Sequence, residues 1–248
     1  MAKKQGQELV QWEEELARAA RETAKGENLP TAKFISMRGG RLSFGGAEIP
    51  GNELRAIVVG SVHENQYYDT DYDPEATSIP ACYAFGTDEE TMEPHEAAQN
   101  KQSEVCKGCP HNEWGSAERG QGKACKNVRR LALVSEDALE EGDIAGAEVA
   151  YLKVPVTSTK NWAVYVKKTL QEVIKRPYWA VITKISVVPD PKSQFKVQFE
   201  FEEAIEDKNA LPKLRDKSVE VMKKIDFPYV IVERKEPVKK QLNKKRKF

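Results

Sequence analysis

The stretch Cys106-Lys107-Gly108-Cys109-Pro110 is the point from which the organisation of this chain can be worked out. Two cysteines separated by two residues bring two thiolates onto one metal ion from a tight turn, and a tetrahedral zinc site then needs two more ligands. The chain has two other cysteines, with 23 residues between Cys82 and Cys106 and 15 between Cys109 and Cys125. The spacing therefore predicts one structural Zn²⁺ ion held by all four thiolates, with no open coordination position.

Other uses of these cysteines are less consistent with the sequence. We expect a cytoplasmic chain with reduced thiols, because its start has no signal-peptide pattern, and this argues against disulfides. A redox C-x-x-C pair would open a helix, whereas Gly108 and Pro110 are turn residues. The zinc centre of a deaminase needs a His or Cys two residues before a catalytic Glu, followed by Pro-Cys-x-x-Cys. No such His-x-Glu or Cys-x-Glu pair stands upstream of Cys106. An iron–sulfur cluster stays open as an alternative, as do His95 and His111 as substitute ligands.

The charge of the chain is unevenly distributed although its net charge is zero. Residues 151–248 carry 23 Lys and Arg against 12 Asp and Glu, while residues 1–150 carry 16 against 27. Such asymmetry between halves favours contact with nucleic acid through the basic side, and solubility with internal charge pairing is the simpler alternative. No apolar run approaches the length of a membrane span, so we expect no membrane association.

Hydrophobic periodicity predicts a β-rich chain with a few helices. Helical patterns cover 7–25, 159–175 and 212–225, the second with an apolar side of Trp162, Val166, Leu170, Val173 and Ile174. A hairpin is expected from 33–37 and 42–44 around Gly39-Gly40. Strand patterns follow at 53–63, 129–134, 148–154, 179–188 and 195–201. In the last of these, Phe195, Val197, Phe199 and Phe201 alternate with polar residues and are expected to face a core.

The segment between the third predicted strand and the last cysteine has little apolar content. Residues 64–96 carry ten acidic residues and no Lys or Arg, and glycine-rich turns surround Trp114. Such a segment cannot bury a core of its own, so we expect a long loop whose order comes from the metal, which contributes about 10–16 kcal/mol in small zinc peptides. The acidic stretch is expected to act as a lid over a basic surface or as a face for a basic partner.

Short strands, a helix between two of them and a zinc loop inserted between strands favour an α+β fold built on an OB-like β-barrel. OB-type barrels bind oligonucleotides on an open strand face and long loops. The predicted organisation is an N-terminal helix within residues 1–30, a barrel domain over 31–232 with the zinc loop at about 64–128, and a basic tail over 233–248. The tail has eight basic residues and one acid from Arg234 onward.

Three stretches resemble a signature of tailed-phage and prophage proteins. They are Cys106-Lys-Gly-Cys-Pro-His-Asn-Glu-Trp-Gly-Ser-Ala with Gly120-Gln-Gly-Lys-Ala-Cys-Lys-Asn-Val-Arg-Arg-Leu131, and Val154-Pro-Val-Thr-Ser158. The resemblance covers about residues 31–205 and is to zinc-containing single-stranded DNA-binding proteins of phage replication and recombination. It implies the same four cysteine ligands, single-stranded DNA as partner and phage replication or recombination proteins as further partners. This chain departs from better-known phage binders, which end in an acidic tail, because it ends in Lys244-Lys-Arg-Lys-Phe248.

The expected nucleic-acid site combines basic residues beside the zinc loop with aromatic residues in polar loops. The basic candidates, which neutralise phosphates, are Lys123, Lys126, Arg129 and Arg130. The stacking candidates are Trp114, Tyr67 and Tyr68. Alternatives accompany them: Trp114 covers the thiolates, the tyrosines fold back on the barrel, and one of the two adjacent arginines faces away because strand residues alternate.

An enzyme is not expected. The sequence has no phosphate-binding Gly-x-x-x-x-Gly-Lys motif and no nucleophile elbow, and three histidines offer few candidates for imidazole catalysis. Asp69, Asp71 and Asp73 are candidate Mg²⁺ ligands of a nuclease, although alternating carboxylates on a loop are commonly solvated. The second functional hypothesis is a zinc-ribbon adaptor whose N-terminal helix docks a replication or transcription protein.

Overall fold

The computed structural model describes residues 34–70, 79–118 and 120–229, so the predicted N-terminal helix and basic tail, with Asp71 and Asp73, lie outside the described residues. The fold is mixed α+β. The chain divides into two compact units, the first of Met1–Gly60 with Leu131–Ser218 and the second of Ser61–Arg130 with Val219–Phe248. The described part of the predicted zinc loop at 64–128 lies within the second unit, to which residues 219–229 also belong.

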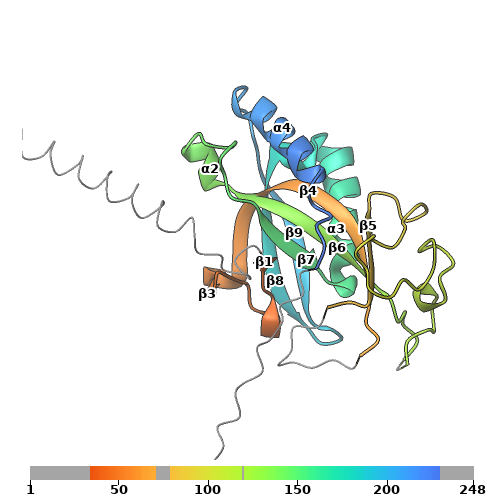
Figure 1. Cartoon of the computed structure of the whole chain (residues 1–248). Coiled ribbons are helices and arrows are strands. Elements are labelled where there is room, and N and C mark those ends of the chain that lie inside the picture. The colour runs from red at the N-terminus through yellow and green to blue at the C-terminus, as the bar shows by residue number, and fades with distance from the viewer. Residues whose placement is uncertain (1–33, 71–78, 119, 230–248) are drawn as a thin grey trace, which may run out of the picture. The chain divides into compact units, whose positions relative to one another are not determined.

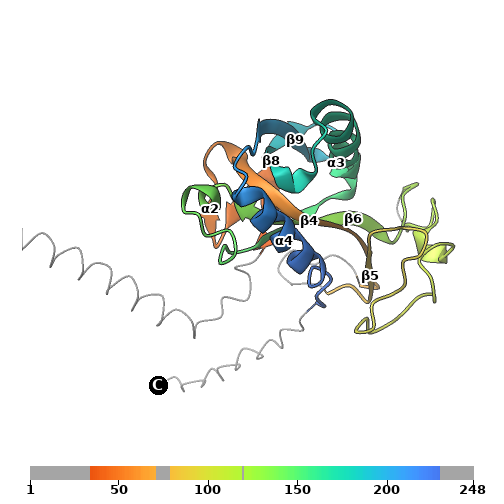
Figure 2. The same cartoon turned by 90° about the horizontal axis from the view of Figure 1, so that it is seen from above.

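The first unit is built on a curled sheet. Its strand order is β1-β7-β6-β4-β8-β9, and Figures 1 and 2 show the sheet bent into half a barrel. The strands are β1 (Phe34–Ile35), β4 (Glu53–Tyr67), β6 (Lys126–Ser135), β7 (Ala150–Val154), β8 (Val181–Asp190) and β9 (Gln194–Ala204). β1 pairs with β7 in parallel, whereas β8 pairs antiparallel with both β4 and β9. β4 and β6 contribute residues to both units.

The strand predictions from sequence agree with this sheet, because alternation is a direct signature of a half-buried strand. In β9, Val197 and Phe199 are buried in the core, and Phe195 and Phe201 pack against it. The intervening polar residues Gln198 and Glu200 are exposed. The four phenylalanine and valine side chains therefore belong to the core of the first unit.

The predicted hairpin around Gly39-Gly40 is confirmed in part, because Ser36 and Ser43 form an antiparallel bridge, and a second hairpin that was not predicted follows it. β2 (Ser43–Phe44) pairs with β3 (Ala47–Glu48) across Gly45-Gly46, which have φ angles of +58° and +87°. Two consecutive positive φ angles suit glycine and form the tight turn that joins antiparallel strands. In the described part of the two segments that the sequence pattern paired, Ser36 and Ser43 exchange both backbone hydrogen bonds, at 2.8 and 2.9 Å.

The predicted helix over 159–175 consists of two parts, α3 (Thr159–Val164) and the π-helix η5 (Tyr165–Ile174). It packs on the sheet through Trp162, whose ring meets that of Phe199 in an edge-on contact with centroids 5.1 Å apart. A π-helix has more residues per turn than an α-helix, so the faces that its residues present differ from those of the expected α-helical period. Accordingly Val173, predicted on the apolar side, is 72% exposed.

The remaining helices are short apart from one. α2 (Asp137–Glu140) is a single turn, and α4 (Ala210–Met222) begins and ends slightly earlier than the predicted 212–225 helix. Single 3₁₀ turns are η1 (Arg38–Gly40), η2 (Pro50–Asn52), η3 (Pro110–Asn112), η4 (Val156–Ser158) and η6 (Tyr178–Ala180). No helix among the described residues is long and apolar enough to cross a lipid bilayer.

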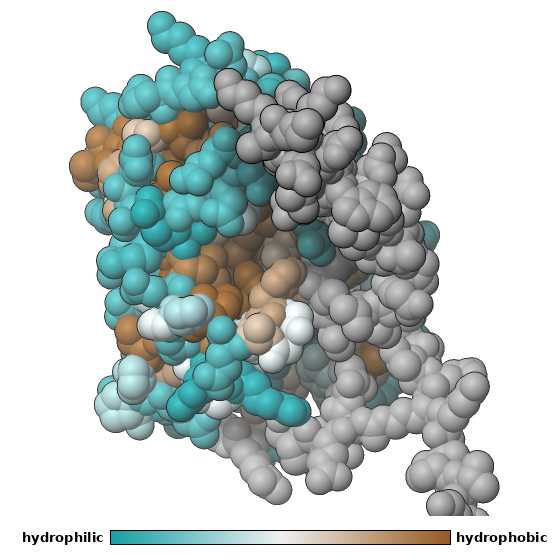
Figure 3. All heavy atoms as spheres, turned by 90° about the vertical axis from the view of Figure 1, so that its left-hand side faces the viewer, coloured by the Kyte–Doolittle hydropathy of each residue, from teal (hydrophilic) through white to brown (hydrophobic). Residues whose placement is uncertain are grey.

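On one face of the molecule, apolar side chains gather around a hollow among polar ones (Figure 3). The first unit has a cavity of about 390 Å³, with a mainly apolar lining that includes Ile35, Phe44, Ile49 and Leu54. Arg55 also lines it, and its guanidinium pairs with Glu136 at 3.0 Å.

The second unit contains a strand that the sequence pattern did not indicate. β5 (Cys82–Gly86) pairs antiparallel with the C-terminal part of β4, from His63↔Gly86 to Tyr67↔Cys82. The expectation of a continuous loop over residues 64–96 is therefore wrong for residues 64–67, which belong to β4, and for residues 82–86, which form β5. Because side chains alternate across a sheet, Asn65, Tyr67 and Cys82 share one face, and Glu64 and Phe85 share the other. The first of these faces meets the cysteine loop.

Candidate metal and nucleic-acid site

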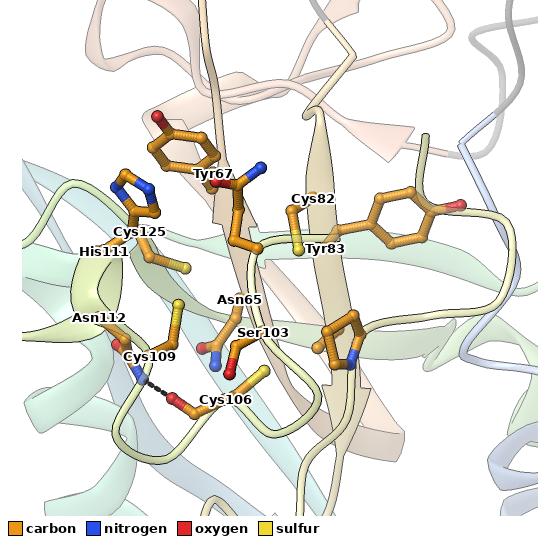
Figure 4. A pocket seen from close by; sticks show the side chains of 13 residues that line it. Asn65, Tyr67, Cys82, Tyr83, Ser103, Cys106, Cys109, His111, Asn112 and Cys125 are labelled. Carbon is orange, nitrogen blue, oxygen red and sulfur yellow. Dashed lines mark hydrogen bonds between the residues drawn. The ribbon is translucent and has the colours of Figure 1, made fainter. Parts of the chain in front are cut away.

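All four cysteines line one small cavity of the second unit, which has a volume of about 20 Å³. β5 supplies Cys82, the C-x-x-C turn supplies Cys106 and Cys109, and Cys125 immediately precedes β6. Figure 4 shows their side chains around this space, with Asn65 and Tyr67 of β4 beside them. The sequence separates Cys82 from Cys125 by 42 residues, and the fold brings them to the same cavity. None of the four forms a disulfide.

The turn that carries the cysteine pair is held by its own backbone. Gly108 has a φ of +76°, a conformation that favours glycine and turns the chain back between the two cysteines. The backbone N–H of Cys106 donates to the carbonyl of Met92 at 2.8 Å, and that of Cys125 donates to His111 at 2.7 Å. The Asn112 side-chain amide donates to the Cys106 carbonyl at 2.9 Å. Hydrogen bonds thus fix the backbone on both sides of the cavity.

The thiols influence one another electrostatically. The pKa of the Cys125 thiol is raised to about 12. Burial is the main cause, and the neighbouring Cys106, Cys82 and Cys109 contribute smaller parts. Burial is also the main cause of the raised pKa values of Cys82 and Cys106, and Cys109 contributes to both. The raised pKa values of Cys82, Cys106 and Cys125 favour their protonated forms, and a bound metal ion would favour the thiolates instead.

The donor set fits zinc in its chemistry. Four sulfur donors around one cavity are the set that structural zinc prefers, with Zn–S distances of about 2.3 Å. In the described part of the chain, no three Cys, His, Asp or Glu side chains already stand as a metal-ligand group. Zinc binding therefore remains a prediction.

The two substitute histidines occupy different places. His111, in η3, lines the cysteine cavity, and its ring lies against that of Tyr67 in a tilted contact with centroids 4.1 Å apart. His95 instead stacks on Tyr83, with centroids 5.1 Å apart, and its Nδ1 accepts from the backbone of Ala97. His111 is thus the histidine placed beside the cysteines.

Trp114 is the most exposed large apolar side chain of the described residues, at 77%. It lies in the loop between η3 and β6, and the Lys123 ammonium is 5.8 Å from its ring centroid. Gly115, next to it, has a φ of +87° and donates its N–H to the Gly122 carbonyl at 3.0 Å. An indole this exposed does not cover the thiols, so that alternative is not supported.

The two lysines of the candidate site are held in the same loop. Lys123 donates to the Asn112 side chain at 3.3 Å, and Lys126 donates to the Lys123 carbonyl at 2.8 Å. Both ammonium groups therefore lie on the loop that carries Trp114. Neither lysine has a described carboxylate within ion-pair distance.

Arg129 and Arg130 point to opposite faces, as strand alternation predicted. Arg129 is half-buried and donates to His63 Nε2 at 2.8 Å, while His63 Nδ1 faces Glu89 at 2.6 Å. Arg130 is 1% exposed and forms two hydrogen bonds to the buried Glu64, at 2.9 and 3.0 Å. A guanidinium with this partner in the interior does not line a surface groove. The prediction that Arg130 contacts phosphate is therefore corrected.

Tyr67 and Tyr68 are both half-buried and engaged within the unit. The Tyr67 ring contacts that of His111 at a tilt, and the Tyr68 hydroxyl donates to Gln66 at 3.1 Å. Burial, with a further effect of Glu64, raises the pKa of Tyr68 to about 12. The alternative that these rings fold back on the protein describes them better than a free stacking platform.

Sequence reasoning missed the polar residues that connect the loop to the strands. Asn127 donates to Asn65 of β4 and, at 3.0 Å, to Asn112 of the loop. Asn65 is 5% exposed. An amide inside a strand pattern is the signal that marks such a position, because buried polar groups need partners.

Comparison of the chain with protein-family models, curated proteins and solved structures gives no significant match. The resemblance to phage single-stranded DNA-binding proteins thus stays a prediction from sequence. The functional argument has to come from the site itself.

Proposed function

We propose that this chain is a sequence-independent, single-stranded DNA-binding protein of phage replication or recombination, and that the cysteine loop carries its contact surface. The observation that carries the proposal is the exposed Trp114 ring with the Lys123 ammonium beside it. Aromatic rings with flanking cations bind unpaired nucleic acid by stacking bases and neutralising phosphates. In this proposal Trp114 stacks a base, and Lys123 and Lys126 bind the backbone.

Arg129 is a third candidate for the phosphates. It is half-buried, so only part of its guanidinium is available to a ligand, and His63 accepts from one of its amino groups. Tyr67 and Tyr68 support the loop rather than stack bases, because each already contacts a neighbour.

A structural zinc ion is part of the proposal. Bound by Cys82, Cys106, Cys109 and Cys125, it would supply the ordering free energy that this loop lacks in apolar contacts. Four thiolates leave no vacant coordination position, so the metal would support binding and not catalysis. The curled sheet of the first unit would then be an OB-like barrel, an architecture that carries oligonucleotides on its strands and loops.

The test is binding of a fluorescein-labelled oligothymidylate, followed by anisotropy over a series of salt concentrations. Trp114→Ala is expected to weaken binding roughly 5- to 150-fold, since stacking on such a ring contributes about 1–3 kcal/mol. Lys123→Ala and Lys126→Ala are each expected to reduce the salt slope by about 0.7. Val105→Ala is the matched control, because Val105 is 37% exposed and belongs to the segment just before the cysteine pair.

Two outcomes would overturn the proposal. Equal affinities for the native chain and Trp114→Ala would remove the stacking platform. A native chain with its metal bound that does not bind the oligonucleotide at low salt would instead favour the adaptor hypothesis, since an exposed tryptophan is also a common anchor in protein interfaces.

A further inference from the structure

The apolar cavity of the first unit is large for a packed protein. Its volume is about 390 Å³, whereas well-packed cores leave few voids larger than a water molecule. Short side chains account for the space, because four of the lining residues are alanines: Ala56, Ala138, Ala147 and Ala150. The volume lies within the range of about 300–1,000 Å³ that is typical of ligand pockets.

The larger apolar side chains of the lining remain partly accessible. Phe44, Ile49 and Leu54 all line the cavity, and each is only half-buried. Figure 3 shows apolar side chains around a hollow on the side of the molecule where Figure 1 draws α2 and β3. A ligand that enters the cavity can therefore contact these side chains from outside.

The entrance of the cavity is acidic. Glu141 and Glu148 belong to its lining, and both side chains are exposed. Neither carboxylate forms an ion pair with a cation in the described part of the chain. The stretch 131–152, to which both belong, contains six Asp and Glu and no Lys, Arg or His. A ligand thus meets negative charge around an apolar interior.

Arg55 is the basic residue of the lining, and its charge is already balanced. Its guanidinium lies 3.0 Å from the Glu136 carboxylate and 3.9 Å from that of Glu203. An anionic ligand would have to compete with these carboxylates and pass the acidic entrance, whereas a cationic ligand is attracted by it. The charges therefore favour a ligand that carries positive charge around an apolar group.

The acidic wall is held in place by α4. The Lys217 ammonium donates to the carbonyl of Ala145 at 2.8 Å, and that of Lys213 donates to the carbonyl of Gly142 at 3.4 Å. These two lysines bind the backbone of the wall and leave its carboxylates at the entrance available. A wall that is fixed in advance lowers the entropic cost of binding a ligand.

The charge of the entrance also separates the candidate occupants. The predicted helix of this chain over residues 7–25 carries five Glu against three Lys and Arg, so its charge does not complement the entrance. Anionic lipid headgroups would be repelled by the same carboxylates. A segment of another protein with basic residues around an apolar side chain fits both the interior and the entrance.

We propose that the cavity docks a basic amphipathic helix of a partner protein. In this arrangement a large apolar side chain of the partner enters between Phe44, Ile49 and Leu54, and its Lys or Arg residues pair with Glu141 and Glu148. Helices bind apolar grooves through anchors spaced three or four residues apart, and few anchors contribute most of the binding energy. The inference goes beyond DNA binding, because the cysteine loop takes no part in it.

The experiment measures binding of fluorescein-labelled helical peptides to the full-length chain by anisotropy. The probe peptide has Leu and Phe on one face, spaced by three or four residues, and Lys on the other faces. One control peptide has Glu in place of Lys, and another has Ala in place of the apolar anchors. The probe is expected to bind about 10- to 150-fold more tightly than the peptide without anchors, since burial of a large apolar side chain is lost there.

Filling the cavity tests its role directly. Ala147→Trp places an indole in the cavity and is expected to weaken binding of the probe peptide about 10- to 150-fold, because the partner's anchor no longer fits. Ala163→Trp adds the same side chain at an exposed position of α3 and is expected to leave binding unchanged. An Ala147→Trp chain that does not fold by far-UV circular dichroism is replaced by Ala147→Leu, which fills less of the space.

The entrance is tested by Glu141→Gln/Glu148→Gln. This variant is expected to weaken binding of the probe peptide about two- to fivefold at low salt, with a smaller difference at high salt, because exposed charge pairs are weak and screened. The control Glu93→Gln/Glu104→Gln removes two exposed charges from the second unit and is expected to have no effect.

The outcomes decide the proposal separately from the DNA-binding one. Native affinity in Ala147→Trp, or equal binding of the lysine and glutamate peptides, would overturn the docking site. Self-association of the native chain that Ala147→Trp abolishes would identify a second copy as the occupant and would also overturn it. Trp114→Ala is expected to leave peptide binding unchanged, and Ala147→Trp to leave oligothymidylate binding unchanged.

Discussion

Replacing Arg130 by methionine is expected to destabilise the second unit severely. The guanidinium is 1% exposed and Glu64 is 0% exposed, and the two are joined by hydrogen bonds of 2.9 and 3.0 Å. Methionine fills much of the same volume and leaves the Glu64 carboxylate buried without its cationic partner, while Tyr229 and Gln66 still donate to it. It also leaves the carbonyls of Ile225 and Phe227 without this donor.

Removal of one partner from a buried pair costs about 3–5 kcal/mol, because the remaining charge is uncompensated. A typical domain has about 5–15 kcal/mol of stability in total, so the loss is a large fraction. The double variant Arg130→Met/Glu64→Gln removes both charges and keeps an acceptor for Tyr229. It is expected to be more stable than the sum of the single changes predicts, by an interaction free energy of about 1–3 kcal/mol.

Urea unfolding followed by far-UV circular dichroism measures these differences, provided that the slope of the free energy with urea is the same in all variants. Lys168→Met, at an exposed position with a 3.8 Å contact to Glu172, is the control for loss of a surface charge and is expected to change stability by less than about 0.5 kcal/mol. A loss below about 1 kcal/mol for Arg130→Met, or strict additivity in the double variant, would refute the reasoning.

Three further predictions concern other parts of the chain. Elemental analysis is expected to find about one zinc ion per native chain and less in Cys109→Ser. The control Ser103→Ala, which changes a non-thiol residue of the same cavity, is expected to keep its zinc. A metal-free native chain would contradict this prediction. The pKa of His63 is lowered by burial and then by Arg129, so the unfolded state takes up a proton before the folded state does, and urea midpoints are expected to fall as the pH drops below about 6.5. This fall should be smaller in His63→Gln, and equal slopes in both proteins would count against it. Tyr165→Phe removes the hydroxyl that lies 2.8 Å from the buried Thr183 hydroxyl, and is expected to lower the free energy of unfolding by about 1–3 kcal/mol, measured by thermal unfolding. The double variant Tyr165→Phe/Thr183→Val is expected to recover part of this loss. No recovery would argue against the hydrogen bond.

The sheet was largely predictable from sequence because alternation follows directly from strand geometry. The alternation from Phe195 to Phe201 identified a core strand, and the apolar stretch within Glu53–His63 identified β4, although not its extension to Tyr67. The extension carries Glu64, Asn65 and Gln66, which are buried and polar. Their burial depends on partners distant in sequence, which a local pattern does not contain.

The gathering of the four cysteines at one cavity was predictable from the sequence, whereas the placement of the basic residues was less so. Cysteine spacing indicates a shared ligand because few other roles need that pattern, and the four thiols do line one cavity. Arginine spacing is less specific, since an arginine serves a surface or a buried carboxylate equally well. Arg130 turns inward because its partners are there: the Glu64 carboxylate and the carbonyl group of Ile225, which lies 95 residues further along the chain.

The alternation of side chains along β4 and β5 places the thiol cavity and the buried Arg130–Glu64 pair on opposite faces of these strands. Odd-numbered residues of β4 from Ser61 to Tyr67 lie on the face of the thiol cavity, and Glu64 and Gln66 lie on the face of the enclosed guanidinium, with β5 in matching register. Insertion or deletion of one residue inside either strand would exchange the two sets, putting a carboxylate among the sulfurs and an asparagine against the arginine. Length changes in this unit are therefore tolerable between the strands and not within them, so related chains should vary in the connection after Tyr68 while keeping the count from Ser61 to Tyr67 unchanged.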